Sequence, residues 1–307
     1  MLSKKNRYAI IDIGTNTCLL LIAEFQKGKV ITITERQEIP RLGKNVDSQK
    51  NISRDAYERV LAVLKTYKEI SKAYRTDAII AIGTSFLRDS SNSSEFINYV
   101  KEKTGIRMKI LSGEEESILS YNGAVFDFKN EEEYAVIDIG GGSTEVSFKE
   151  EEHHYEVSMD VGSLRIKERF LSEKPTEKEI NSAKNFINEN LKSLNVAGFY
   201  KKGLIGVAGT LTTLSAIKME LKKFEPEKIH KTVLDYDDVL NTFNRLIKLS
   251  DDEILNIGDY MKGRSDIITS GILILLQIMN ILESNEIFVS TKGLRYGVYL
   301  DLVKGAK

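Results

Sequence analysis

Two short segments of the chain place a carboxylate just before a tight, glycine-containing turn. The first reads Asp12-Ile13-Gly14-Thr15-Asn16-Thr17, and the second reads Asp138-Ile139-Gly140-Gly141-Gly142-Ser143-Thr144-Glu145. Turns of this kind expose backbone N–H groups that bind anions, and carboxylate oxygens suit a hydrated divalent metal ion. The first segment taken alone fits an ordinary hairpin turn equally well.

The second segment is the stronger signal. Its three consecutive glycines weaken a strand, because glycine loses the most backbone entropy on folding. That loss is understandable if a ligand such as phosphate must approach the backbone closely. Asp138 and Glu145 flank the glycines and can hold Mg²⁺ beside the phosphate. We therefore favour phosphate binding over a merely flexible turn.

Three adjacent acids, Glu114, Glu115 and Glu116, open a predicted helix that ends near Val125. Acidic side chains complement the dipole at the start of a helix, and this accounts for Glu114 and Glu115. We expect one of the three to face a cleft, because the helix lies just before the predicted domain join. A carboxylate in that place can orient and deprotonate a water molecule.

Four basic residues lie beside predicted elements: Arg88, Arg264, Lys292 and Arg295. An arginine at the end of a buried strand can fork onto phosphate oxygens. Each of the four could equally form an ion pair at the surface, as Arg88 could with the adjacent Asp89. Surface pairing is the default for any one of them taken alone.

The elements that position these residues occur twice, at an offset of 126 residues. Residues 8–14 read YAIIDIG and residues 134–140 read YAVIDIG, and Gly83-Thr84 recurs as Gly209-Thr210. Two matched pairs at one spacing predict a duplicated α/β domain, with two halves that face each other across a cleft.

Each half begins with a predicted strand–turn–strand unit and continues with an amphipathic helix and a buried strand. Ser53 caps the first such helix, and Thr176 to Glu179 form a capping box for its counterpart. Such repeated units predict one helix-covered sheet per domain. We assign residues 1–126 to the first domain and 127–307 to the second, with residues from about 296 packing back on the first.

Composition limits the classes of protein. A net charge of −1 provides no general field for nucleic acid or for an anionic membrane. The longest apolar segment, Ile267–Leu282, is shorter than a bilayer span of about 20 residues, so we predict a buried helix and no membrane partner. The single cysteine, Cys18, is interpreted as a buried small hydrophobe and indicates a reducing, cytoplasmic location.

Other polar residues are interpreted as unrelated to function. His153 and His154 are predicted to lie at a solvated hairpin tip, and His230 is predicted to have no nearby partner. The three histidines therefore predict no zinc site. The sequence contains neither a Gly-x-x-x-x-Gly-Lys-Ser/Thr loop nor a Gly-x-Gly-x-x-Gly segment opening a helix, which argues against P-loop NTPases and Rossmann dehydrogenases.

Six blocks occur in a fixed order: Asp12–Thr17, Thr84–Arg88, Leu111–Glu116, Asp138–Glu145, Gly209–Leu214 and Gly293–Arg295. Together they resemble the exopolyphosphatase/guanosine pentaphosphate phosphatase family, in a short two-domain form, over nearly the whole chain. The resemblance implies two ribonuclease-H-like domains of the actin, heat-shock chaperone and sugar-kinase superfamily around a central cleft. The sequence departs from the family pattern at Ser117 and Tyr296, and it ends without the C-terminal helical domains of longer members.

The resemblance also implies a role for each matching residue. Glu116 matches the catalytic base, and Asp138 and Glu145 match the cleft carboxylates, with Asp138 the favoured Mg²⁺ ligand and Asp12 a further metal candidate. The phosphate-binding candidates are Gly14, Thr15, Asn16, Thr17, Gly140, Gly141, Gly142, Ser143, Arg88, Arg264, Gly209 and Thr210. Mn²⁺ in place of Mg²⁺, a monovalent cation and a homodimer are left open.

The sequence therefore predicts Mg²⁺-dependent hydrolysis of the terminal phosphoryl of inorganic polyphosphate. Removal of the 5′-terminal phosphate of guanosine pentaphosphate would use the same residues and is the nearest alternative. An ATP-dependent kinase or chaperone-like ATPase needs an adenosine pocket, for which residues 206–211 are only a partial signal. A non-catalytic sensor of polyphosphate or alarmone is a third class, against which the three cleft carboxylates argue.

Overall fold

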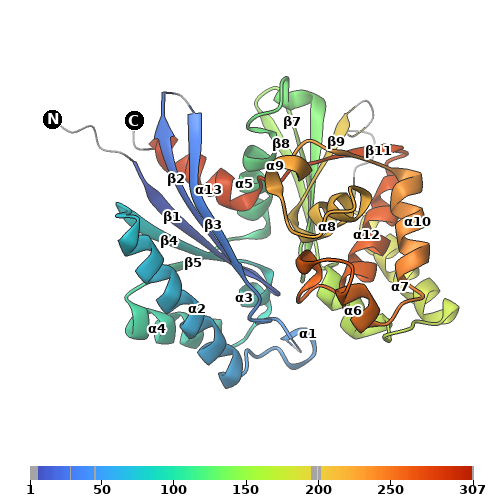
Figure 1. The fold of residues 1–307 in the computed structure, drawn as a ribbon, viewed down its shortest axis with the longest axis horizontal. Helices are drawn as coiled ribbons and strands as arrows, with labels where there is room; N and C mark the ends of the chain where they lie inside the picture. The colour runs from blue at the N-terminus through green and yellow to red at the C-terminus, as the bar shows by residue number, and fades with distance from the viewer. Residues whose placement is uncertain (1–5, 28, 45, 195–198, 200–201, 306–307) are drawn as a thin grey trace. The chain divides into compact units, whose positions relative to one another are not determined.

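The chain divides into two compact units, seen in a computed structural model that describes residues 6–27, 29–44, 46–194, 199 and 202–305. The first unit comprises the residues up to Leu119 together with those from Leu294, and the second unit comprises Ser120–Gly293. Each unit is built around one mixed sheet covered by helices (Figure 1). This confirms the predicted α/β class with two ribonuclease-H-like units.

The sheet of the first unit has the strand order β3-β2-β1-β4-β5. β1 pairs antiparallel with β2 and parallel with β4, while β2–β3 is antiparallel and β4–β5 is parallel. Its strands are β1 (Tyr8–Ile13), β2 (Cys18–Gln26), β3 (Lys29–Glu38), β4 (Ala78–Gly83) and β5 (Met108–Ile110). Its helices are α1 (Val46–Gln49), α2 (Arg54–Ala73), α3 (Ser85–Asp89), α4 (Ser93–Thr104), α13 (Leu294–Gly305) and the first part of α5 (Gly113–Val125).

The two faces of the first sheet carry separate apolar clusters, because successive strand residues point to opposite faces. Ile11 and Ile13 pack in the cluster that contains Val60 of α2 and Val100 of α4. Ile10 packs in the other cluster, with residues of α13. Asp12 shares the face of Ile10 by the same alternation. The end of β1 therefore presents its carboxylate on the α13 side.

The sheet of the second unit has the order β10-β11-β9-β6-β7-β8, in which β6 pairs antiparallel with β7 and parallel with β9. Its strands are β6 (Tyr134–Ile139), β7 (Thr144–Glu150), β8 (His153–Met159), β9 (Gly203–Val207), β10 (Val233–Asp235) and β11 (Glu286–Val289). Its helices are α6 (Ser163–Phe170), α7 (Glu177–Leu191), α8 (Ala208–Lys218), α9 (Pro226–Ile229), α10 (Tyr236–Leu246), α11 (Asp251–Leu255) and α12 (Ile268–Ile281), with the 3-10 turns η1 (Glu131–Glu133) and η3 (Asp259–Met261).

The second sheet is also buried on both faces. Ile137 and Ile139 pack in a large cluster with α7, α8, α10 and α12, whose residue Ile272 has no exposed surface. Val136 points the other way and packs against Tyr121 and Val125 of α5. Asp138 shares the face of Val136, so it lies on the α5 side of this sheet.

The two predicted turns have the same geometry. Ile13 pairs with Cys18 and Ile139 pairs with Thr144, so each hairpin closes over four residues. The N–H of the first turn residue donates to the carbonyl of the fourth, over 2.9 Å in one hairpin and 3.0 Å in the other. The repeat seen in the sequence is therefore a repeat in three dimensions.

The sequence signals for helix ends are confirmed. Ser53 accepts a hydrogen bond from the N–H of Ala56 at the start of α2, and Thr176 and Glu179 form the predicted capping box of α7. Cys18 is buried in β2, and burial raises the pKa of its thiol. In the described part of the chain, no helix is long and apolar enough to cross a membrane.

The prediction for His154 is wrong. The hairpin tip is formed by Glu151 and Glu152, and both histidines belong to β8, although His153 is exposed there. The ring of His154 packs edge-on against Tyr121, with 5.0 Å between ring centroids. Burial lowers the pKa of His154 to about 4, so this ring is neutral at pH 7. The alternating pattern of β8 was missed because its residues are largely polar.

We predict that Gly297→Ala destabilises the first unit. A Cβ at this position in α13 would lie 1.7 Å from the backbone oxygen of Leu119, which is main chain and cannot turn aside. The overpacking should lower the free energy of unfolding by about 1–3 kcal/mol. Denaturant unfolding measures this loss. Gly305→Ala in the same helix is the control, since a Cβ there meets nothing within 4 Å, and an equal loss in both variants would contradict the explanation.

Candidate active site

Two carbonyl groups in the turn after β1 are fixed by hydrogen bonds from backbone N–H groups. The oxygen of Thr15 accepts a hydrogen bond from the N–H of Gly43 over 2.7 Å, and the oxygen of Asn16 accepts one from Arg41 over 3.2 Å. In a planar trans peptide the N–H points opposite to the carbonyl. The N–H groups of Asn16 and Thr17 are thereby directed away from these donors, in the arrangement that suits an anion.

Arg88 and Glu116 form an ion pair, and the helix that carries Arg88 begins in contact with this turn. Ser85, at the start of α3, shares a 3.1 Å hydrogen bond with the hydroxyl of Thr15. Three residues later, Nη1 of Arg88 donates to Oε2 of Glu116 over 2.6 Å and to the oxygen of Leu111 over 2.9 Å. The structure therefore brings the predicted base and a predicted phosphate-binding arginine together. The carboxylate partner seen for Arg88 is Glu116 and not the adjacent Asp89.

The three acids at the start of α5 have different surroundings. Glu114 is exposed. Glu115 accepts from the N–H of Ser112 and pairs with Lys109, which hold the pKa of Glu115 below its usual value. Glu116 is buried, at 7% exposure. Glu114 and Glu115 therefore fit the interpretation that acidic side chains complement the dipole at the start of the helix, whereas Glu116 is enclosed by the protein.

The glycine turn after β6 is fixed by the start of α6. The oxygen of Gly140 accepts from the N–H of Ser163, and that of Gly141 from the N–H of Leu164, both over 2.9 Å. The oxygen of Gly142 accepts from Nε of Arg165 over 2.7 Å. By the same peptide geometry, the N–H groups of residues 141–143 point away from α6, which makes a three-donor nest for an anion.

Asp138 and Glu145 lie side by side, because they are directly paired across β6 and β7. Opposed residues of an antiparallel pair share one face of the sheet. Ser120 donates to Asp138, and Ser158 donates to Oε1 of Glu145 over 2.8 Å. Burial raises the pKa of Asp138 despite the hydrogen bond from Ser120. A buried and a half-buried carboxylate on one face favour a cation between or beside them.

Gly209, Thr210 and Arg264 are also brought together. A Cβ at Gly209 would lie 1.5 Å from Nη1 of Arg264, so the guanidinium packs directly on this glycine. Burial lowers the pKa of Arg264 to about 10, and it stays charged at neutral pH. The preceding residue, Ala208, has a φ of +67°, which costs conformational energy for a residue other than glycine.

The predicted site residues thus form two groups, one in each unit. The first unit holds Asp12, the turn 14–17, Arg88 and Glu116, and the second holds the turn 140–143, its two carboxylates, Gly209, Thr210 and Arg264. Among the described residues, no three histidine, cysteine, aspartate or glutamate side chains gather closely enough to enclose a metal ion. Asp138 and Glu145 nevertheless fit Mg²⁺, which is commonly held by one or two carboxylates, with water and substrate phosphates completing its shell.

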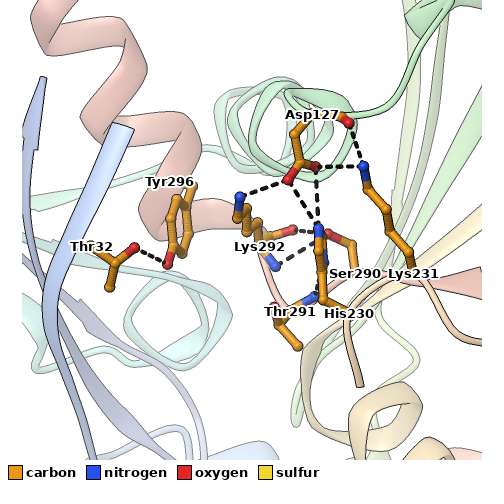
Figure 2. Close-up of polar contacts among 8 residues, drawn as sticks. All are labelled: Thr32, Asp127, His230, Lys231, Ser290, Thr291, Lys292 and Tyr296. Carbon is orange, nitrogen blue, oxygen red and sulfur yellow. Dashed lines mark hydrogen bonds and ion pairs between the residues drawn. The ribbon is translucent and has the colours of Figure 1, made fainter. Parts of the chain in front are cut away.

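The prediction that His230 has no nearby partner is wrong. Its Nε2 lies 3.0 Å from Oδ2 of Asp127, and its Nδ1 accepts a 3.3 Å hydrogen bond from the N–H of Thr291 (Figure 2). Lys292 donates to the same carboxylate over 2.7 Å. Burial by itself would raise the pKa of Asp127, but the hydrogen bonds from His230 and Lys292 outweigh it and hold that pKa well below its usual range.

Lys292 and Arg295 are therefore occupied by structural contacts. Arg295 donates to the oxygen of Leu20 and lies 3.0 Å from a carboxylate oxygen of Glu35. Tyr296, one of the two departures from the family pattern, shares a 2.8 Å hydrogen bond with Thr32 and anchors α13 on β3 (Figure 2). Ser117, the other departure, has a fully buried side chain.

Sequence reasoning missed Arg165. Its side chain is 4% exposed and contacts the glycine turn directly. The only sequence signal is its place in Asp160-Val161-Gly162-Ser163-Leu164-Arg165, a glycine-containing turn that opens a helix after a strand. That pattern does not say which residue the arginine meets, because the glycine turn lies more than twenty residues earlier in the chain.

Two repeated α/β units, each with a tight turn at the end of its first strand, define a protein of the ribonuclease-H-like class. Comparison with known families agrees: the model of the Ppx/GppA phosphatase family matches residues 21–306. The chain belongs to this family.

Similar proteins include a bifunctional 3-dehydroquinate synthase/phosphatase of Fusobacterium nucleatum, 33% identical over 98% of this chain. The match covers 47% of that protein, so the chain spans about half its length. Exopolyphosphatase 2 of Mycobacterium tuberculosis is 29% identical, with 96% of this chain and 98% of that protein covered.

Two solved structures share the fold over nearly their whole length. An exopolyphosphatase from Cytophaga hutchinsonii has a TM-score of 0.91 at 27% identity, with 98% of this chain and 99% of that chain covered. The Aquifex aeolicus member of the Ppx/GppA family has a TM-score of 0.81 at 29% identity, with the same coverage of both chains.

We predict that Asp127→Asn lowers the free energy of unfolding at pH 7 by about 1–3 kcal/mol, since hydrogen bonds to a charged group are lost. The folded-state pKa of Asp127 lies below its unfolded value. Its stabilising contribution is therefore complete above about pH 4 and is lost as the pH falls towards the folded-state pKa. Denaturant unfolding between pH 3 and pH 8 should show the two proteins converging below pH 4.

The control for this prediction is Asp301→Asn, which changes an exposed aspartate of α13. We expect its unfolding free energy to stay within about 0.5 kcal/mol of the wild type at every pH, as is usual for surface substitutions. A difference between Asp127→Asn and the wild type that persists unchanged at pH 3 would show that the charge of Asp127 is not what stabilises the cluster.

Proposed function

We propose that the protein hydrolyses the terminal phosphoryl group of inorganic polyphosphate and releases orthophosphate. The observation that supports this best is the burial of Glu116 against Arg88, in the unit that also holds a turn whose N–H groups suit an anion. A carboxylate in such surroundings is a candidate general base for a water molecule. The similarity to Exopolyphosphatase 2 over nearly the full length of both proteins supports polyphosphate as the substrate.

In the proposed reaction, the oxygen of a water molecule forms a bond to the terminal phosphorus while the bond from that phosphorus to the bridging oxygen breaks. The bridging oxygen leaves with the shortened chain, and Glu116 accepts a proton from the water. The backbone nest at residues 14–17, in the same unit as Glu116, binds non-bridging oxygens, whose charge it stabilises in the transition state. The nest at residues 140–143 of the second unit is likewise suited to phosphate oxygens. Arg88 and Arg264 bind phosphate oxygens further along the chain.

Asp138 and Glu145 are the residues that would hold Mg²⁺. The ion would neutralise charge on the transferring phosphoryl group. Asp138 shows why a cation suits this place, because burial makes its ionised form unfavourable when no positive charge is near. We also infer a cytoplasmic location, on the ground that a single buried cysteine is consistent with a reducing compartment.

The nearest alternative substrate is guanosine pentaphosphate, whose terminal phosphate would use the same residues. Phosphate release in the presence of Mg²⁺ from long polyphosphate, guanosine pentaphosphate and ATP, at equal terminal-phosphate concentration, distinguishes them. A preference for polyphosphate supports the proposal, and a preference for the guanosine nucleotide replaces it with the alternative. Release from ATP alone points to an ATPase or kinase, and tight binding without release points to a sensor.

We predict that Glu116→Gln lowers kcat by about 100-fold or more, since general-base catalysis contributes 10²–10⁴-fold. The amide keeps the size of the side chain, so binding of the chain substrate should change little. Glu114→Gln is the matched control on the same helical turn, because Glu114 is exposed. Its kcat should equal that of the wild type. Full turnover by Glu116→Gln would show that another group activates the water.

A further inference from the structure

The glycine turn of the second unit is held by a buried arginine. Arg165 lies in the first turn of α6, and its side chain is 4% exposed. Its Nε donates to the oxygen of Gly142 over 2.7 Å, and its backbone N–H donates to the oxygen of Gly141 over 3.2 Å. One residue thus contacts two successive carbonyls of the turn.

These contacts determine where the neighbouring N–H groups point. The peptide that joins Gly142 to Ser143 is planar and trans, so a carbonyl turned toward Arg165 directs the N–H of Ser143 to the opposite side. If this peptide turned over, its carbonyl oxygen would replace an N–H in the nest and repel an anion. The hydrogen bond from Nε opposes that rotation.

The two repeated turns differ in how much they need such a restraint. In the first turn, Thr15 and Asn16 carry side chains, and a β-branched residue such as Thr15 restricts the backbone. Its carbonyls are held by backbone N–H groups of Gly43 and Arg41. In the second turn the matching residues are Gly141 and Gly142, which have the widest conformational freedom. The side chain of Arg165 therefore fixes the orientation of a peptide that the glycines by themselves would leave free to rotate.

We propose that Arg165 is a positioning residue for phosphate binding by the glycine turn, acting through the Gly142–Ser143 peptide. This inference rests on the proposed function only in taking a phosphoryl anion as the ligand. Arginine suits the task because its Nε–H donates sideways from a rigid plane. In the same guanidinium, Nη2 lies 3.7 Å from Oδ1 of Asp160. A lysine keeps the charge without that fixed fork.

The variants Arg165→Met and Arg165→Lys test the proposal. Loss of one oriented donor should lower kcat by about 10- to 100-fold for the methionine variant, by analogy with the removal of an oxyanion-hole donor. KM for long polyphosphate should change by less than about threefold, because most of the chain is bound elsewhere. The dissociation constant of inorganic phosphate, titrated calorimetrically with Mg²⁺, should rise by about tenfold, since each 1.4 kcal/mol is a factor of ten.

Arg165→Lys should fold as the wild type does and show the same changes to a smaller degree. Arg169→Met is the matched control, because Arg169 is an exposed arginine of the same helix whose guanidinium lies over the ring of Phe186. Its kcat and phosphate affinity should equal those of the wild type. Circular dichroism and thermal unfolding, recorded for every variant, separate loss of fold from loss of function.

The outcomes distinguish this inference from the proposed function. If the wild type releases phosphate from no substrate, the proposed function fails, and phosphate affinity alone still tests Arg165. If the methionine variant does not fold, the lysine variant decides. Wild-type kcat and phosphate affinity in a folded Arg165→Lys or Arg165→Met protein, with or without a lower melting temperature, would make Arg165 a purely structural residue and overturn the inference.

Discussion

The candidate site depends on one pairing that occurs in both units: the first strand lies parallel to the strand that follows the next long helix. Ile13 therefore ends beside Gly83, and Asp138 ends beside Val207. Parallel strands bring their carboxyl ends to one edge of a sheet. The tight turn after each first strand is thereby placed next to the start of a helix, α3 in the first unit and α8 in the second.

The two repeats use this edge differently. Asp12 and Asp138 are equivalent, but the cross-strand neighbour of Asp12 is Leu19, whereas that of Asp138 is Glu145. The pair of carboxylates that suits a cation is thus confined to the second unit. The first unit instead provides the ion pair of the buried Glu116 with the half-buried Arg88. The two repeats of one scaffold thus carry different sets of polar groups at equivalent strand ends.

Several partly buried charges in this protein have specific partners. Arg88 is neutralised by Glu116, and Asp127 by Lys292 with a hydrogen bond from His230. An unpaired charge would be expensive to bury, whereas a hydrogen-bonded pair is tolerated and fixes a geometry. The arginines near the two turns accordingly do more than balance charge. They fix the positions of carboxylate and carbonyl groups on which anion binding depends.

The sequence by itself determined the local features. The strand–turn–strand units, the caps at Ser53 and Thr176 and the buried strands all follow from patterns a few residues long, where a turn or a cap is satisfied by its immediate neighbours. The repeat then identified the two turns as equivalent. The largely polar strand β8 and the helix α13 were not predicted, because tertiary packing and not a local sequence pattern defines them.

Only the tertiary structure decided which polar side chains meet. It paired Glu116 with Arg88, and it joined His230 to Asp127 across 103 residues of sequence. It also placed Arg165 on a carbonyl of the glycine turn. Such contacts depend on how strands pair and helices pack over long stretches of chain, so no pattern of neighbouring residues contains them. The residue types indicated which chemistry is possible, whereas the tertiary structure determined which side chains lie close enough to one another to take part in it.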